Sequence, residues 1–199
     1  NLYLNIDTYV YTLIISLLLS VPAFIKKKDE KKTNIYEKII TIILGYILIP
    51  TVISIPYFLS IYNISFLDCY FESISGFTST GFTIFDNIKH IDQSLILWRS
   101  STQWLGGLYF LISIILLIDI FDKNLKKSLT DYLSFNSSEI FKQSFKIIII
   151  YTFLTLIIFI FLKIINLRTF DAFNFSLTLI SSGGFMPTNN IDLLFQNDI

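Results

Sequence analysis

Apolar residues in this chain are gathered into four long runs, at about 9–25, 39–62, 95–118 and 147–162. Each run approaches the roughly 20 residues that a helix needs to cross a bilayer. Because backbone groups cannot remain unpaired in lipid, we expect all four runs to be helices. Two prolines interrupt the second run, which a helix packed inside a membrane bundle tolerates. The pattern predicts an all-α integral membrane protein.

Basic residues predict how these helices are oriented. Of the 15 Lys and Arg residues, 11 lie in the segments 26–38 and 123–146. Cytoplasmic loops of membrane proteins carry an excess of Lys and Arg. If the four helices alternate in direction, both basic segments fall on the same side, which we assign to the cytoplasm. The segments 63–94 and 166–199 then face outward. The chain begins with Asn1 rather than Met and ends after a loop-like stretch, so we interpret it as a fragment.

Composition excludes several other kinds of protein. The chain is 53% hydrophobic and 15% charged, with a mean hydropathy of +0.66 and no net charge, so nucleic acid is not expected as a partner. Cys69 is the single cysteine, which excludes an internal disulfide and a cysteine metal site. The predicted spans carry no paired catalytic carboxylates, zinc motif or Ser/His pair, so we do not expect an enzyme.

The outward segment 63–94 begins with a stretch that is too short to span a membrane and too apolar for an ordinary loop. Ser65 and Asp68 resemble the start of a capped helix. The stretch ends in Thr78-Ser79-Thr80-Gly81. A short helix followed by such a turn predicts a re-entrant pore loop. Exposed carbonyls of the turn can replace the water shell of an ion, and the negative end of the helix dipole favours a cation.

The same layout recurs after the fourth apolar run. A short segment beginning at Asp171 leads into Ser181-Ser182-Gly183-Gly184. Matching Thr80-Gly81 to Ser182-Gly183 gives a period of 102 residues, whereas matching Asp68 to Asp171 gives 103, so the register stays open by one residue. Internal repeats of this kind are typical of transport proteins.

The two repeats divide the chain into four predicted parts. They are an N-terminal transmembrane helix with a cytoplasmic loop at 1–36, a first helix–pore-loop–helix repeat at 37–120, a cytoplasmic connection at 121–143, and an incomplete second repeat at 144–199.

Three stretches resemble motifs of the Trk/Ktr/HKT potassium transporters. Residues 71–81 (FESISGFTSTG) resemble the first pore loop, residues 98–107 (WRSSTQWLGG) the start of the helix that follows it, and residues 181–185 (SSGGF) the second pore loop. The resemblance covers about residues 37–190, and the first helix is more similar to the Trk branch. It implies four helix–pore-loop–helix repeats around one pore, as in the potassium-channel-like superfamily. The implied function is potassium uptake, with a sodium-permeable or sodium-coupled cation transporter and a non-conducting structural subunit as alternatives.

The resemblance also implies a set of ion ligands, namely the backbone carbonyls of Thr78, Ser79, Thr80, Gly81, Ser181, Ser182 and Gly183. Potassium would then be held at Ser79, Thr80, Ser181 and Ser182. Ser182 stands where the family usually has Thr, a change of little consequence if carbonyls bind the ion. The resemblance further implies a homodimer in the bacterial inner (plasma) membrane, in contact with lipid. A cytoplasmic nucleotide-binding regulatory subunit would gate the pore, and no organic cofactor is expected.

Glu72 and Arg99 are candidates for supporting the filter. Glu72 shares a helix face with Asp68 and either concentrates cations at the outer mouth or accepts hydrogen bonds from the loop; we favour the second. Arg99 pairs with one of these carboxylates, holds the filter loop by hydrogen bonds, or simply lies at the membrane interface. Its fixed fork of donors favours the pairing. Gly106-Gly107 allows close helix packing, which we favour over a hinge.

Overall fold

The computed structural model describes residues 6–25, 35–60, 62–117 and 140–188. Every regular element in these ranges is helical. In chain order they are α1 (Ile6–Ile25), α2 (Ile35–Phe58), α3 (Phe66–Phe77), the short 3-10 helix η1 (Ile88–His90), α4 (Gln93–Leu117), α6 (Ile140–Ile164) and α7 (Thr169–Ile180). The prediction of an all-α fold is confirmed. Most of the predicted cytoplasmic loops, at 26–34 and 118–139, lie outside the described residues.

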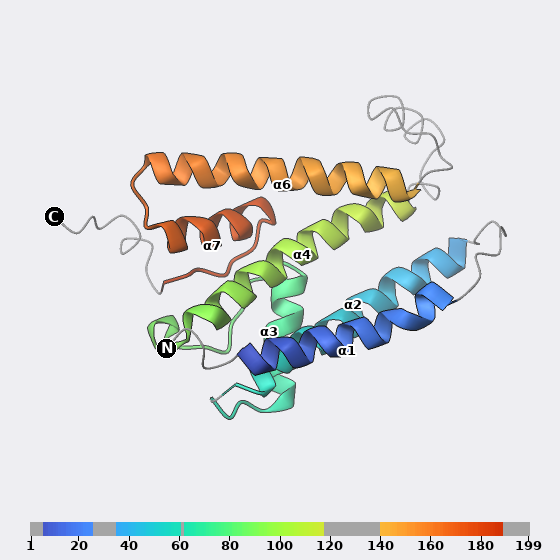
Figure 1. Cartoon of the computed structure of the whole chain (residues 1–199), viewed down its shortest axis with the longest axis horizontal. Helices are drawn as coiled ribbons and strands as arrows, with labels where there is room; N and C mark the ends of the chain where they lie inside the picture. Colours follow the sequence, from blue (N-terminus) through green and yellow to red (C-terminus); the bar gives the residue numbers. More distant parts are fainter. Residues whose placement is uncertain (1–5, 26–34, 61, 118–139, 189–199) are drawn as a thin grey trace.

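Three helices are long and apolar enough to cross a membrane, namely α2, α4 and the part of α6 from Ser144 to Ile164. Within α1, residues Ile6–Val21 form a shorter apolar helix. The end of α1, the start of α2, the end of α4 and the start of α6 lie at the same end of the molecule, on the right in Figure 1. The helices therefore alternate in direction as the sequence predicts.

Helix ends differ from the apolar runs for local reasons. Helix α2 begins at Ile35 and α6 at Ile140, earlier than the runs, because polar and charged residues such as Lys38 and Lys146 continue a helix without adding apolar character. Helix α6 thus begins inside the predicted connection 121–143. Helix α2 ends at Phe58 rather than near 62, because its last turn tightens and Asn63 then adopts a positive φ of 49°, which ends a right-handed helix.

Two short helices are inserted between the long ones. Helix α3 packs between α2 and α4, and α7 packs between α4 and α6, so that α4 contacts both short helices (Figure 1). A buried apolar cluster around α3 includes Tyr57, Cys69, Phe77 and Leu95. Since α3 and α7 have only 12 residues each, they are too short to span a bilayer.

The backbone fixes the register of the internal repeat. Helix α7 begins and ends 103 residues after α3. Asn63 and Asn166, also 103 apart, both have positive φ before the short helix, and Ser79 and Ser182 both have positive φ after it. The register left open by the sequence is therefore 103. Under this register Gly81 corresponds to Gly184, so the alternative match of Gly81 to Gly183 is wrong by one residue.

Candidate ion pathway

The first loop folds back onto the end of α3. The N–H groups of Thr80 and Gly81 both donate to the carbonyl of Ser75, at 2.9 and 3.3 Å, and the N–H of Ser79 donates to Gly76. The Ser75 hydroxyl donates to the carbonyl of Phe82 at 2.5 Å. The backbone N–H groups of Ser79, Thr80 and Gly81 are therefore all bonded to carbonyls of α3, the helix that precedes the loop.

The second loop has the same construction. The N–H of Ser182 donates to the carbonyl of Leu179 at 3.0 Å, and that of Gly183 donates to Thr178 at 2.8 Å. Within the described part of the chain, no hydrogen bond uses a carbonyl oxygen of residues 78–81 or 181–184. Each loop therefore offers a set of carbonyl acceptors that no described residue uses.

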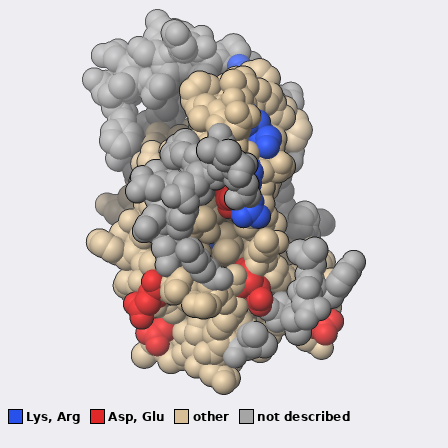
Figure 2. All heavy atoms as spheres, turned by 90° about the vertical axis from the view of Figure 1, so that its left-hand side faces the viewer, with Lys and Arg blue, Asp and Glu red and all other residues tan. Residues whose placement is uncertain are grey.

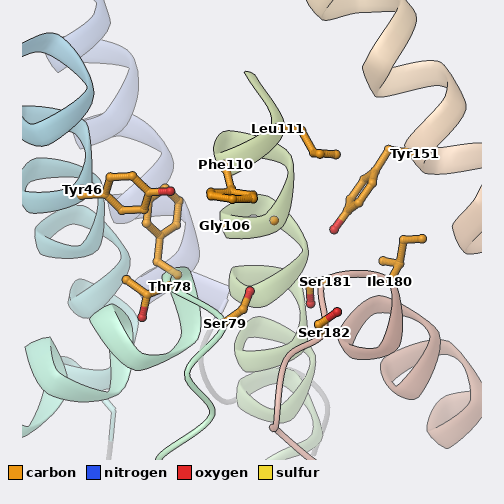
Figure 3. A pocket seen from close by; sticks show the side chains of 12 residues that line it. Tyr46, Thr78, Ser79, Gly106, Phe110, Leu111, Tyr151, Ile180, Ser181 and Ser182 are labelled. Atoms are coloured by element: carbon orange, nitrogen blue, oxygen red, sulfur yellow. The ribbon is translucent and has the colours of Figure 1, made fainter. Parts of the chain in front are cut away.

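A cavity of about 520 Å³ lies where the two loops meet. Of the predicted ligand residues, Thr78 and Ser79 line it from one loop, and Ser181 and Ser182 from the other. Figure 3 shows these four side chains together, with Gly106 of α4 above them. The negative ends of two helix dipoles point toward this cavity, which favours a cation there.

Thr80, Gly81 and Gly183 continue the loops beyond this cavity. Gly81 has a positive φ of 81°, and a Cβ atom on it would lie 2.5 Å from the Cα of Gly184. The two loops therefore touch at a pair of equivalent glycines: a side chain at Gly81 has no room, and one at Gly184 would lie in tight contact, 3.1 Å from the Cα of Gly81.

Behind the first loop lies a buried ion pair. Arg99 and Glu72 are 1% and 0% exposed, and Arg99 Nε donates to Glu72 Oε1 at 2.8 Å. Thr83 joins them, since Arg99 Nη2 donates to its hydroxyl at 2.9 Å and that hydroxyl donates to Glu72 Oε1 at 3.0 Å. Glu72 Oε2 also accepts from the N–H of Ile84 at 2.9 Å. The structure thus pairs Arg99 with Glu72 rather than with Asp68, and Glu72 accepts hydrogen bonds from the loop.

Three further residues contact the loops although the sequence analysis gives them no individual role, namely Thr83, Gln103 and Phe185. Phe185 of the second loop is buried, its ring lies 4.2 Å from Arg99 Cζ, and its N–H donates to Gln103 Oε1 at 3.3 Å. Gln103 is four residues after Arg99, so the helical period alone places both on one face of α4. Thr83 and Phe185 carry no comparable local signal.

Helix α4 approaches the first loop through Gly106. A Cβ atom there would collide with the backbone of Phe77 at the end of α3. At Gly107 the nearest atom would instead be the hydroxyl of Tyr151, at 2.5 Å. The glycine pair therefore serves close packing, as favoured from the sequence.

The face of the molecule shown in Figure 2 carries acidic groups. The described part of the segment after α2 includes Asp68, Asp86 and Asp92, and acidic side chains lie at several places on the face shown in Figure 2. Negative charge around an opening raises the local concentration of cations.

Comparison with known proteins agrees with this geometry. Residues 6–192 match the sequence profile of the TrkH family, described as cation transport proteins. The chain belongs to this family. It is 29% identical to a cation transporter of Methanocaldococcus jannaschii that is itself uncharacterised, over 95% of this chain and 41% of that protein. It is 25% identical to the Trk system potassium uptake protein TrkH of Escherichia coli, over 80% of this chain and 34% of that protein.

A solved structure shows the same fold. The crystal structure of the potassium transporter TrkH from Vibrio parahaemolyticus superposes with a TM-score of 0.72 and 22% sequence identity, covering 92% of this chain and 37% of that one. Membership of the family establishes a membrane protein with the TrkH fold. The chain spans about two fifths of the length of these relatives.

Proposed function

We propose that this chain supplies two of the pore-lining units of a protein that carries potassium ions across a membrane. The observation that carries the proposal is a pair of loops at the ends of two short helices. Their carbonyls, at residues 78–81 and 181–184, accept no hydrogen bond within the described part of the chain. Carbonyl oxygens in such loops replace the hydration shell of potassium.

Two loops provide only part of a filter that encloses an ion. The resemblance to Trk/Ktr/HKT transporters implies four, and the relatives matched by this chain are more than twice as long. We therefore propose that the remaining carbonyls come from further units of the same kind. Potassium would be held at Ser79, Thr80, Ser181 and Ser182, with Glu72 and Arg99 supporting the first loop.

The same resemblance supports three further proposals about the setting. We place the protein in the bacterial inner membrane as a multi-pass protein, assembled as a homodimer. We also propose a cytoplasmic nucleotide-binding regulatory subunit as its partner. Copurification of such a subunit with the tagged full-length protein from membranes tests this assembly, and recovery of a single subunit type would contradict it.

Transport is tested in cells that lack their own potassium uptake. The full-length protein should restore growth at low external potassium and should take up rubidium as a potassium analogue. Gly81→Asp should abolish both, because its side chain would meet Gly184 and place a charge in the filter. Asn63→Asp is the matched control, since it adds the same charge at a turn outside the filter where Asp tolerates positive φ.

Two results would contradict the proposal. One is absence of uptake by a wild-type protein that is verified in the membrane. The other is wild-type uptake by Gly81→Asp, which would place the ion path elsewhere. Sodium uptake at a rate equal to that of potassium would favour the sodium-permeable alternative.

A further inference from the structure

The second loop rests on the first repeat through one residue, Phe185. Its ring lies against the Arg99 guanidinium, and its N–H donates to Gln103; both partners are on α4. A Cβ atom at Gly76 would lie 3.0 Å from the Phe185 ring, so the ring also packs against α3. Phe185 is 2% exposed.

The equivalent residue of the first loop is placed differently. Phe82 is 103 residues before Phe185 and is 69% exposed. Within the described residues, only the second of these two phenylalanines contacts α4.

Gln103 is fully buried although one of its polar atoms has no hydrogen-bond partner among the described residues. It is 0% exposed, and its amide group abuts Gly183, where a Cβ atom would collide with it. Its Oε1 accepts from Phe185, but its Nε2 has no hydrogen-bond partner among the described residues. A buried donor without an acceptor costs free energy, and an apolar side chain of similar size would remove that donor but leave the Phe185 N–H unpaired instead. The Gln103 oxygen is therefore the atom through which this side chain holds the second loop.

We propose that Gln103 is a positioning residue that fixes the second filter loop against the first repeat and thereby sets discrimination between potassium and sodium. This rests on the proposed function. Discrimination in a carbonyl-lined filter depends on the number, field strength and spacing of the carbonyls. Gln103 holds the N–H two residues after Gly183, and Arg99 holds the ring of the same residue. With the oxygen of Gln103 removed, the loop relaxes around the smaller ion and discrimination falls.

The test is Gln103→Met in the full-length protein. Methionine has nearly the volume of glutamine, removes the acceptor for Phe185 and also removes the unpaired donor. We expect the unfolding midpoint to be unchanged, because the unpaired Phe185 N–H replaces the unpaired Gln103 donor, while the potassium-to-sodium uptake ratio falls about three- to tenfold, the size expected for one lost hydrogen bond. The matched control is Gln93→Met, because Gln93 is exposed at the start of the same helix; neither quantity should change in it.

The possible results distinguish the role of Gln103 from the proposed function of the whole protein. An unchanged uptake ratio in Gln103→Met overturns the role of Gln103 and leaves the proposed function intact. A fall in the ratio that occurs only with a matching fall in the unfolding midpoint shows a merely structural role. If Gln103→Met does not reach the membrane, Gln103→Leu is the second variant, and failure of both also overturns the proposal, since the residue is then required for folding. Absence of any uptake by the wild-type protein contradicts the proposed function itself.

Discussion

Removing one partner of the Arg99–Glu72 ion pair should destabilise this protein more than removing both. The two groups are buried with an Nε–Oε1 distance of 2.8 Å. Breaking a buried pair leaves an uncompensated charge away from water, which costs about 3–5 kcal/mol of unfolding free energy. Replacing both partners by apolar residues of similar size removes that charge entirely.

The contacts that remain in each single variant predict which of the two loses more unfolding free energy. In Arg99→Met, Glu72 keeps two donors, the Thr83 hydroxyl and the Ile84 N–H. In Glu72→Met, Arg99 keeps the Thr83 hydroxyl and the Phe185 ring. A carboxylate with two remaining donors is better satisfied than a guanidinium with one remaining acceptor. We therefore expect Arg99→Met near about 3 kcal/mol and Glu72→Met near about 5 kcal/mol.

The double variant should lose much less than the two single losses combined. It leaves the Ile84 N–H without its acceptor, which costs about 1–3 kcal/mol. Equilibrium unfolding of the purified full-length protein in mixed detergent, followed by circular dichroism, measures all three variants. The control is Arg168→Met, because Arg168 is 77% exposed and lies 3.9 Å from Asp171; such a pair contributes about 0–1 kcal/mol. Losses that simply add in the double variant would refute the reasoning.

Two further substitutions test the packing and the capping. Gly106→Ala should reduce the amount of folded protein in membranes far more than Gly107→Ala. A Cβ at Gly106 collides with the backbone of Phe77, whereas a Cβ at Gly107 meets the Tyr151 hydroxyl, which can move, and Ser181 at 3.0 Å or more. Equal amounts of the two variants would contradict the close-packing role of Gly106. Ser65→Ala should lower the unfolding free energy by about 1 kcal/mol, because the Ser65 hydroxyl accepts from the Asp68 N–H at the start of α3. Ser65→Thr should restore most of this loss. An alanine variant as stable as the wild type would show that the cap is unimportant.

The long helices and short re-entrant helices follow from local features of the sequence. Apolar runs predicted α2, α4 and α6, and the residues Ser65 to Asp68 predicted the start of α3, where the structure shows the capping bond. Helix ends were less well predicted, because lysine-bearing turns continue a helix without adding apolar character. The roles of the seven predicted ligand residues stay predictions.

The register of the repeat shows what a sequence pattern leaves open. Ser182-Gly183 and Thr80-Gly81 look equivalent as residue types, yet the backbone places Gly184 opposite Gly81. The two asparagines before the short helices, Asn63 and Asn166, are 103 residues apart and could have decided the matter, because Asn is favoured at positive φ. By contrast, the contact of Phe185 with Gln103 joins residues 82 apart in sequence and has no local signature.

Helix α4 explains why the two loops form one site. Arg99, Gln103 and Gly106 follow one another at spacings of four and three residues, so they share a helix face. That face binds Glu72 and Thr83 behind the first loop, Phe185 in the second, and the backbone at the end of α3. Buried polar side chains are costly inside a membrane span. The contacts that Arg99 and Gln103 make with the loops therefore explain their presence on this long, mostly apolar helix, and α4 is the element that contacts both loops.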